Sequence, residues 1–298
     1  MDLRPLRPLR PLAACWSEAR PVVQAIFLMR FLAGALLVDP GHLARPGPVA
    51  LGAAGWSCST IAIYVFNGIA DREEDVANGS TRPIASGRLS PGYAGRVVSV
   101  LAALGLACSW SVGSAEGLCA TLYLLLGYAY SGPPFPLKNT YLTCTLGGVC
   151  LGLTTYFGGC AAVGRGVSAP FAIFAGAMSL WMGGVGGIAK DLSDVEGDRL
   201  AGRRTLPILV GERSARRLLA VVAGLVALSF GAVAGISSAR LGWCAGAVLI
   251  GAVAVGRSSV AAPAVESRER ARVPYRLFMW TQHATHIVLA ASIWAIAH

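Results

Sequence analysis

The chain has 298 residues, of which 55% are hydrophobic and only 13% are charged. Soluble domains carry about 25% charged residues, so this composition disfavours a soluble enzyme and excludes a disordered chain or a disulfide scaffold. The formal net charge is +10, but nucleic-acid binding would need a basic face on a soluble fold. Here the basic residues separate long apolar stretches, and we expect no nucleic-acid partner.

The apolar stretches predict an all-α, polytopic membrane bundle with about nine transmembrane helices. A spanning helix needs about 20 mostly apolar residues. In chain order, the candidate stretches lie near residues 21–38, 47–70, 92–112, 114–131, 140–163, 168–189, 214–236, 241–256 and 277–297. We expect one transmembrane domain over residues 21–298, preceded by a basic cytoplasmic segment over residues 1–20.

The placement of Lys and Arg predicts the orientation of this bundle. All but four of the 25 basic residues lie on the side of the N-terminus and of the loops after the second, fourth, sixth and eighth stretches. The exceptions are Arg30, Arg45, Arg165 and Arg240. By the positive-inside rule the rich side is cytoplasmic, and the C-terminus lies on the opposite side.

Acidic residues gather in two windows on the predicted cytoplasmic side, residues 71–75 (DREED) and 191–198 (DLSDVEGD). Residues spaced to share one helix face lie in each window: Asp71 and Asp75 in the first, preceded at the same spacing by Asn67, and Asp191, Asp194 and Asp198 in the second. Like charges so placed repel one another and favour a bound cation. Oxygen ligands alone suit Mg²⁺, which binds through a few carboxylates and substrate phosphates. The alternative is a pair of solvated acidic loops that cap helices.

The sequences around both windows resemble the two signatures of the UbiA family of intramembrane prenyltransferases. NGIADREEDVANGSTRPIASGRLS resembles the first signature, NxxxDxxxD followed by RPI and G. KDLSDVEGDRLAGRRTLPILVG resembles the second, in the form found in the homogentisate and chlorophyll branches. The resemblance implies a helical bundle around a central cavity that opens sideways to lipid. There, Mg²⁺ would ionise a polyprenyl diphosphate, and the prenyl group would pass to a usually aromatic acceptor.

This resemblance, together with the chemistry of diphosphate departure, assigns roles to the acids. Asp71 and Asp75 would hold one Mg²⁺, with Asn67 as a neutral ligand or a donor to the diphosphate. Asp191, Asp194 and Asp198 would hold a second Mg²⁺, and the four aspartates other than Asp198 are the candidate catalytic residues. The remaining acids of the two windows, Glu73, Glu74 and Glu196, are expected to stay solvated.

Basic residues near the windows are candidates for diphosphate contacts, because the Arg fork matches phosphate oxygens. They are Arg20, Arg30, Arg82, Arg88, Lys138 and Lys190. Lys138 is matched to the family's diphosphate-binding lysine, although the usual YxxxK spacing is absent. Ordinary membrane anchoring is the alternative for Arg82, Arg88 and Lys190, and snorkelling or a structural pair is the alternative for Arg30. Arg203 and Arg204 are expected to be anchors.

An allylic cation needs an electron-rich, dry lining, which aromatic rings supply. The candidates within the stretches are Tyr64, Phe66, Tyr123, Tyr128, Tyr156, Phe157, Trp181 and Trp280. His283 and His286 lack a third metal ligand, and their role stays open.

The sequence thus predicts Mg²⁺-dependent prenyl transfer from a polyprenyl diphosphate to an aromatic acceptor within the membrane. Two alternatives remain: a UbiA-type membrane terpene cyclase and, more remotely, a cation transporter that binds ions at the acidic clusters. The identity of the acceptor, the prenyl chain length and the oligomeric state stay open.

Overall fold

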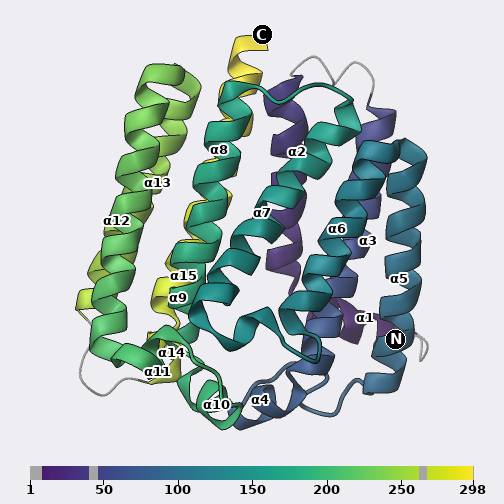
Figure 1. Ribbon diagram of the computed structural model, residues 1–298, viewed down its shortest axis with the longest axis vertical. Coiled ribbons are helices and arrows are strands. Elements are labelled where there is room, and N and C mark those ends of the chain that lie inside the picture. Colours follow the sequence, from purple (N-terminus) through teal and green to yellow (C-terminus); the bar gives the residue numbers. More distant parts are fainter. Residues whose placement is uncertain (1–8, 40–45, 262–266, 298) are drawn as a thin grey trace, which may run out of the picture.

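The computed structural model describes residues 9–39, 46–261 and 267–297, which are almost entirely helical. The long helices lie side by side, and most of the short ones gather at one end of the bundle (Figure 1). The long helices are α2 (Pro21–Val38), α3 (Gly47–Ala70), α5 (Pro91–Val112), α6 (Ser114–Ser131), α7 (Tyr141–Val163), α8 (Ala169–Leu180), α12 (Glu212–Ser237), α13 (Ala239–Val260) and α15 (Val273–Ala297). The short helices are α1 (Leu9–Glu18), α4 (Arg72–Ala77), η2 (Leu137–Asn139), η3 (Trp181–Gly186), α9 (Gly187–Asp191), α10 (Val195–Leu200), α11 (Leu206–Val210) and α14 (Arg268–Ala271).

The predicted all-α membrane bundle is confirmed. Within the described ranges, seven helices are long and apolar enough to cross a bilayer, if the run from α8 through η3 to α9 is taken as one. The two further predicted stretches fall on α6 and α15, which have 18 and 25 residues and run beside the others. Nine is therefore an approximate count of spans. Of the predicted N-terminal segment, residues 1–8 lie outside the described residues, as does Arg45, and the part from Leu9 forms helix α1.

Helix starts follow from local sequence. α5, α7, α8 and α13 each begin after a Ser or Thr whose hydroxyl accepts a hydrogen bond from the amide three residues on. Such N-caps satisfy one of the free amide groups at a helix start. Proline in the first turn of α5 and α8 adds a preset backbone angle. These signals place each helix start close to a predicted boundary.

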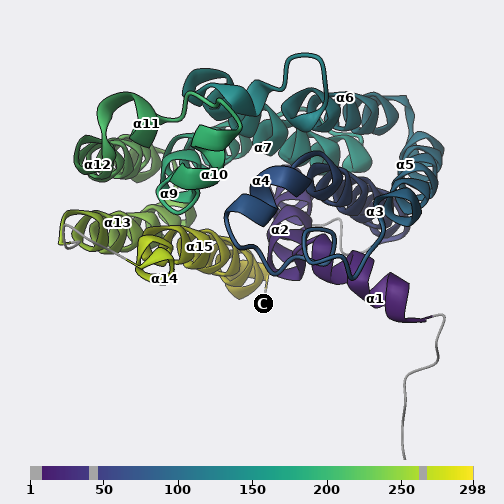
Figure 2. The same ribbon diagram turned by 90° about the horizontal axis from the view of Figure 1, so that it is seen from below.

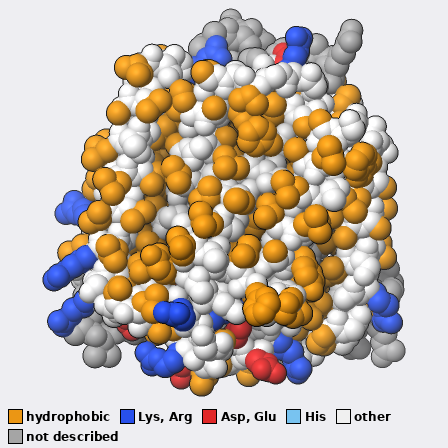
Figure 3. Space-filling view, in the orientation of Figure 1, with side chains coloured by type: hydrophobic (Ala, Val, Ile, Leu, Met, Phe, Trp, Pro, Cys, Tyr) orange, Lys and Arg blue, Asp and Glu red, His pale blue; other side chains and the backbone are white. Residues whose placement is uncertain are grey.

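The outer surface of the bundle is apolar over most of its height. Ile236, Trp243 and Ile250 are each at least 72% exposed, which is unfavourable in water and favourable against lipid tails. Figure 3 shows hydrophobic side chains spread over the face of the bundle, with Lys, Arg, Asp and Glu gathered mainly toward its lower end. The protein is therefore an integral, multi-pass membrane protein.

A cavity lies inside the bundle, lined by α2, α3, α6, α7, α15 and the run from η3 to α9. Seen from the end that carries the short helices, α4 and α10 lie close together below the bundle (Figure 2). These two helices follow α3 and α9 along the chain, so they bring the two acidic windows to the same end.

Close packing of α2 against α7 fixes one wall of this cavity. A side-chain carbon at Gly159 of α7 would overlap the carbonyl oxygen of Phe31, and one at Gly34 of α2 would overlap the carbonyl oxygen of Tyr156. Small residues let helix backbones approach in this way where lipid provides no hydrophobic drive for association. The contact holds the cavity face of α2 in place.

We expect Gly159→Leu to destabilise the protein by about 1–3 kcal/mol or more, because α2 and α7 must separate to admit the side chain. Thermal unfolding in detergent should then show a melting temperature lower by several degrees. Gly176→Leu in α8 is the control, since no atom lies within 4 Å of the added carbon there. Equal melting temperatures for both variants would contradict the close packing of α2 on α7.

Candidate active site

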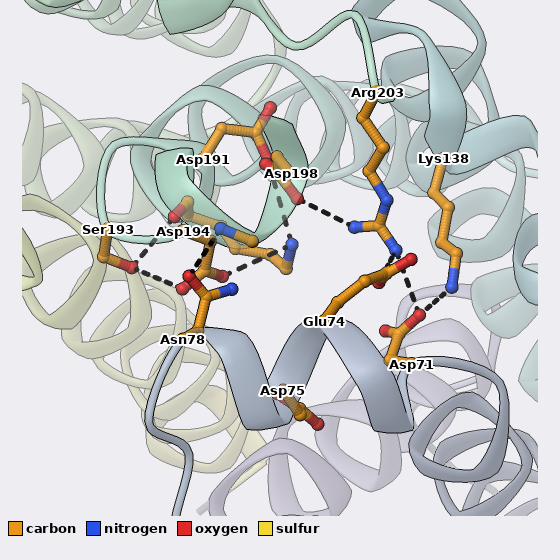
Figure 4. Close-up of polar contacts among 12 residues, drawn as sticks. Asp71, Glu74, Asp75, Asn78, Lys138, Asp191, Ser193, Asp194, Asp198 and Arg203 are labelled. Carbon is orange, nitrogen blue, oxygen red and sulfur yellow. Dashed lines mark hydrogen bonds and ion pairs between the residues drawn. The ribbon is translucent and has the colours of Figure 1, made fainter. Parts of the chain in front are cut away.

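The two acidic windows meet at one end of the bundle. Asp71 caps the C-terminus of α3, and Asp191 is the last residue of α9. Figure 4 shows side chains from α4 facing those from the α9–α10 segment, with Lys138 and Arg203 reaching between them. The backbone N–H of Gly197 in α10 donates to Asn78 Oδ1 at 2.9 Å, which ties the loop after α4 to the second window.

Arg203 joins the two windows directly. Its Nη2 pairs with Asp71 Oδ1 at 3.0 Å and also with the Glu74 carboxylate, while its Nη1 donates to Asp198 Oδ1 at 3.0 Å. The side chain of Arg203 is only 4% exposed, so these are low-dielectric ion pairs. Burial raises the pKa of both Glu74 and Asp198, against the opposing effect of Arg203.

Lys138 lies in η2, next to Asp71, and forms an ion pair with that carboxylate. Asn67 Nδ2 donates to the other Asp71 oxygen at 2.9 Å and to Ser131 Oγ at 2.8 Å. Burial, together with the charges of Arg203 and Lys190, lowers the pKa of Lys138. A further anion at this place would favour the charged lysine.

Lys190 is shared between two aspartates of the second window. Its Nζ lies 3.8 Å from Asp191 Oδ1 and 3.6 Å from Asp194 Oδ2. The third aspartate, Asp198, is buried, and its Oδ2 has no hydrogen-bond partner. The second window therefore keeps one buried carboxylate oxygen free.

The cavity above these residues has a volume of about 1100 Å³, counting its open mouth. Its polar end is lined by Arg20, Asn67, Asp71, Lys138, Lys190, Asp191 and Arg203. Arg20 adopts a left-handed backbone conformation with φ of 57°, a strained state for a residue other than glycine that is typical of functional sites. The lining also includes the aromatic rings of Phe27, Tyr64, Tyr123 and Phe278, and those of Tyr130 and Tyr275 near the charged end. One space thus combines a charged end with an aromatic interior.

Comparison with known proteins agrees with this geometry. The sequence model of the UbiA prenyltransferase family matches residues 27–282. The chain belongs to the UbiA prenyltransferase family. A digeranylgeranylglyceryl phosphate synthase of Natronomonas pharaonis is 32% identical over 193 residues, which cover 63% of this chain and 65% of that protein. The bacteriochlorophyll synthase 33 kDa chain of Cereibacter sphaeroides is 34% identical, over 52% of each chain. This chain thus spans less than two thirds of the length of either relative.

Solved structures share the fold of this UbiA chain. A UbiA homolog from Archaeoglobus fulgidus bound to GPP and Mg²⁺ superposes with a TM-score of 0.70 at 17% identity, over 93% of this chain and 99% of the other. The apo structure of a UbiA homolog from Aeropyrum pernix K1 gives a TM-score of 0.71 at 21% identity, with the same coverage. The predicted family resemblance is confirmed, and so is the predicted fold.

Several predicted site residues of this UbiA chain lie together and others do not. The cavity lining includes Arg20, Arg30, Asn67, Asp71, Lys138, Lys190 and Asp191. Asp194 and Asp198 stand directly behind this lining, against Lys190 and Arg203. Arg88 is exposed and hydrogen-bonds the Thr81 carbonyl and the Ser86 hydroxyl of its own loop. It is therefore placed as a loop or anchoring residue.

Asp75 and Arg82 pair with each other outside the cavity lining. Arg82 Nη1 lies 2.7 Å from Asp75 Oδ2, and its Nη2 lies 2.6 Å from the buried Glu18 carboxylate at the end of α1. The backbone leaves helical geometry at Asp71, where φ is −92° and ψ is 9°. Asn67, Asp71 and Asp75 therefore do not lie on one continuous helix face, as their spacing had predicted. In this arrangement Arg82 braces the first window against α1.

Two residues were assigned wrongly from the sequence. Arg203 was expected to be an anchor, yet it is buried between the two windows. Glu74 was expected to stay solvated, yet it pairs with Arg203. Arg204, the next residue after Arg203, is exposed, and Glu73 and Glu196 are exposed as well. One feature of the sequence could have indicated the position of Arg203: it stands five residues after Asp198 and directly after a glycine. Gly202 has φ of 67° and forms the turn there.

The aromatic prediction is partly confirmed. Of the eight candidates, Tyr64 and Tyr123 line the cavity. Tyr156 and Trp181 are buried in the core, whereas Trp280 is 67% exposed on the outside. His286 hydrogen-bonds the Tyr156 hydroxyl at 2.7 Å, and His283 faces the carbonyl oxygens of Met279 and Val22. Both histidines therefore have structural partners.

The donor set fits a metal held together with a diphosphate. Among the described residues, no three His, Cys, Asp or Glu side chains converge on one point, so a bare metal would find too few ligands. The available donors are nevertheless all oxygens, and Asp198 Oδ2 is buried without a partner. Mg²⁺ takes one or two carboxylates and completes its shell with water and substrate phosphates. Asp71, Asp191, Asp194 and Asp198 would be the residues to hold it together with a diphosphate.

We expect Arg203→Ala to destabilise the protein by about 3 kcal/mol, because the buried carboxylate of Asp198 and the partly buried carboxylates of Asp71 and Glu74 would lose their shared cation. The measurement is thermal unfolding in detergent. Arg204→Ala is the matched control, since this neighbouring arginine is exposed. If both variants melted like the wild type, Arg203 would not hold the two windows together.

Proposed function

We propose that this protein transfers a prenyl group from a polyprenyl diphosphate to an aromatic acceptor within the membrane, in a reaction that depends on Mg²⁺. The observation that carries the proposal is the cavity with charged residues at one end and aromatic rings in its interior. The solved homolog from Archaeoglobus fulgidus holds GPP and Mg²⁺. The same substrate class suits both ends of the cavity in this chain.

The charged end has the groups that a diphosphate requires. Lys138, Lys190 and Arg203 line it and place positive charge around one space. Each is neutralised in part by carboxylates, so these cations are positioned before the substrate arrives. Mg²⁺, when bound, neutralises the charge that develops on the departing diphosphate. The lysines and Arg203 stabilise the same charge in a site with little bulk water.

The aromatic interior suits the prenyl cation. When the bond between the prenyl carbon and the diphosphate oxygen breaks, the electron pair leaves with the diphosphate. The allylic cation then faces the rings of Tyr64 and Tyr123, whose π faces attract positive charge. A nucleophilic atom of the acceptor forms the new bond and releases a proton.

The cytoplasmic placement of this site is part of the proposal. The site lies at the end of the bundle where most basic residues gather, which the positive-inside rule assigns to the cytoplasm. The N-terminus would then be cytoplasmic and the end of α15 would lie on the opposite side.

We expect a membrane-impermeant maleimide to label Arg165→Cys in intact cells and Arg88→Cys only after permeabilisation. Both positions are exposed at opposite ends of the bundle. The label is located by mass spectrometry of the tryptic peptides, because the chain has eight native cysteines. Labelling of Arg88→Cys in intact cells would reverse the orientation.

We expect Asp71→Ala and Asp191→Ala each to lower Mg²⁺-dependent release of diphosphate from geranyl diphosphate by at least about 100-fold, the usual effect of removing a group that stabilises developing charge. The assay measures inorganic diphosphate with and without an acceptor panel. Glu73→Ala and Glu196→Ala are the controls, because these acids lie in the same windows and are exposed.

Unchanged diphosphate release by both aspartate variants would show that Asp71 and Asp191 do not belong to the active site. If the wild type formed a cyclic hydrocarbon without any acceptor, the protein would be a cyclase and the proposed transferase function would be wrong.

A further inference from the structure

Arg30 is a buried cation at the inner end of the cavity. It lies in the middle of α2, is 1% exposed, and lines the cavity together with Met182 and Gln282. An arginine inside a membrane protein is costly unless it is paired or functional. The donor diphosphate would be its simplest partner.

The helical rise places Arg30 too deep for that diphosphate. Ten residues separate it from Arg20 at the start of α2, which corresponds to about 15 Å along the helix. Gln282 follows the first residue of α15 by nine residues, so it lies about 13 Å from that end of the bundle. Met182, which also contacts Arg30, precedes Asp191 by nine residues. A diphosphate that is held by Asp71 and Asp191 is only a few ångströms long and ends well short of Arg30.

The surroundings of Arg30 do not neutralise its charge. Its guanidinium donates to Gln282 Oε1 and to the Met182 sulfur, and it lies 5.2 Å from the centre of the Phe27 ring. The Tyr156 hydroxyl also hydrogen-bonds Arg30, and all four neighbours are neutral. Within the described part of the chain, no carboxylate pairs with it.

Two N–H groups beside this cation have no partner or only a weak one. Arg30 Nε is buried without a hydrogen-bond partner. Gln282 turns its oxygen to Arg30, and its Nε2 has only the Met279 sulfur at 3.6 Å. Two N–H donors beside an uncompensated charge match the two oxygens of a carboxylate or phosphate.

The helix opposite Arg30 departs from regular α-helical geometry beside this residue. Trp181–Gly186 forms a π-helical turn, and Met182 of this turn contacts Arg30. Such turns are rare and occur often at functional sites. A side-chain carbon at Gly183 would meet the backbone of Thr145 and Val149 in α7, so this turn packs closely against its neighbour.

From these observations we infer that Arg30 and Gln282 bind an anionic group of the acceptor, a carboxylate or a phosphate, at the end of the cavity away from the donor diphosphate. This inference rests on the proposed transferase function. The acceptor then lies with its anionic group inward and its nucleophilic atom toward the donor. Arg30 acts as a specificity residue, because a neutral analogue would leave the guanidinium unpaired.

The test compares the affinities of paired probes for the full-length protein in detergent, with Mg²⁺ and a non-hydrolysable geranyl thiodiphosphate present. One pair is para-hydroxybenzoate and para-hydroxybenzamide, and the other is phenyl phosphate and phenol. We expect the anionic member of at least one pair to bind about tenfold or more tightly in calorimetry, as for a charged hydrogen bond. The pair with the larger ratio distinguishes a carboxylate from a phosphate.

Two variants should reduce this ratio to about one. Arg30→Gln removes the cation, and Gln282→Glu supplies an internal carboxylate that pairs with Arg30 while keeping the shape of the side chain. Arg216→Gln is the matched control, because Arg216 is a buried arginine of α12 that does not line the cavity; it should keep the wild-type ratio. If Arg30→Gln fails to fold, Gln282→Glu still decides the outcome.

A wild-type ratio near one for both pairs would overturn the inference, and so would a ratio that survives both variants. Acceptance of longer prenyl diphosphates by Arg30→Gln with an unchanged ratio would also overturn it, since Arg30 would then limit chain length. Mg²⁺-dependent diphosphate release is measured on the same preparations. Its absence from the wild type would contradict the proposed function, whereas normal release with equal probe affinities would contradict only the acceptor site.

Discussion

Carboxylates stand at the C-terminal ends of two membrane helices, where the helix dipole disfavours negative charge. Asp71 follows the last turn of α3, and Asp191 ends α9. Such an arrangement is stable only when cations lie close by. Arg203 meets this need in the protein itself by bridging both acidic windows from one buried position. The attraction between Arg203 and the carboxylates of both windows explains why the loops after α3 and α9 fold toward each other.

The rest of the bundle keeps this charged end separate from an apolar interior. Close contact between α2 and α7 through Gly34 and Gly159 shapes the wall above the charged residues. The pair of Arg82 with Asp75 and Glu18 holds the first window against α1 and leaves Asp71 to face the second window. A substrate with a charged head and a long apolar tail would match both parts of the cavity. Prenyl diphosphates have this form.

The sequence predicted the helices well, because membrane spans are defined by length and apolar character. It also predicted that the two acidic windows lie at the same end, since both follow even-numbered spans. Details of side-chain direction could not be predicted in this way. The ideal helical spacing of Asp71 and Asp75 ignores the changed backbone angles at Asp71, and in the structure Asp75 pairs with Arg82. Glu74, in turn, pairs with Arg203 instead of staying solvated.

Long-range partners were equally hidden from spacing arguments. Arg203 lies in a run of basic residues that resembles an ordinary membrane anchor, and only the turn at Gly202 brings it back between the windows. Likewise, the position of Arg30 within a span indicated a functional residue. Its depth relative to the acidic residues depends on how three helices pack together, which the sequence does not show. Gln282 and Met182 come from distant parts of the chain and meet Arg30 only in the folded bundle.

We propose that both acidic windows and their cations form one site for a metal and a diphosphate together. Calorimetric titration with geranyl thiodiphosphate, with Mg²⁺ and without it, tests this claim most directly. We predict tight binding when both are present, and binding weaker by at least about tenfold for the diphosphate alone, because its charge then faces unshielded carboxylates. Equal affinity with and without Mg²⁺ would contradict the claim.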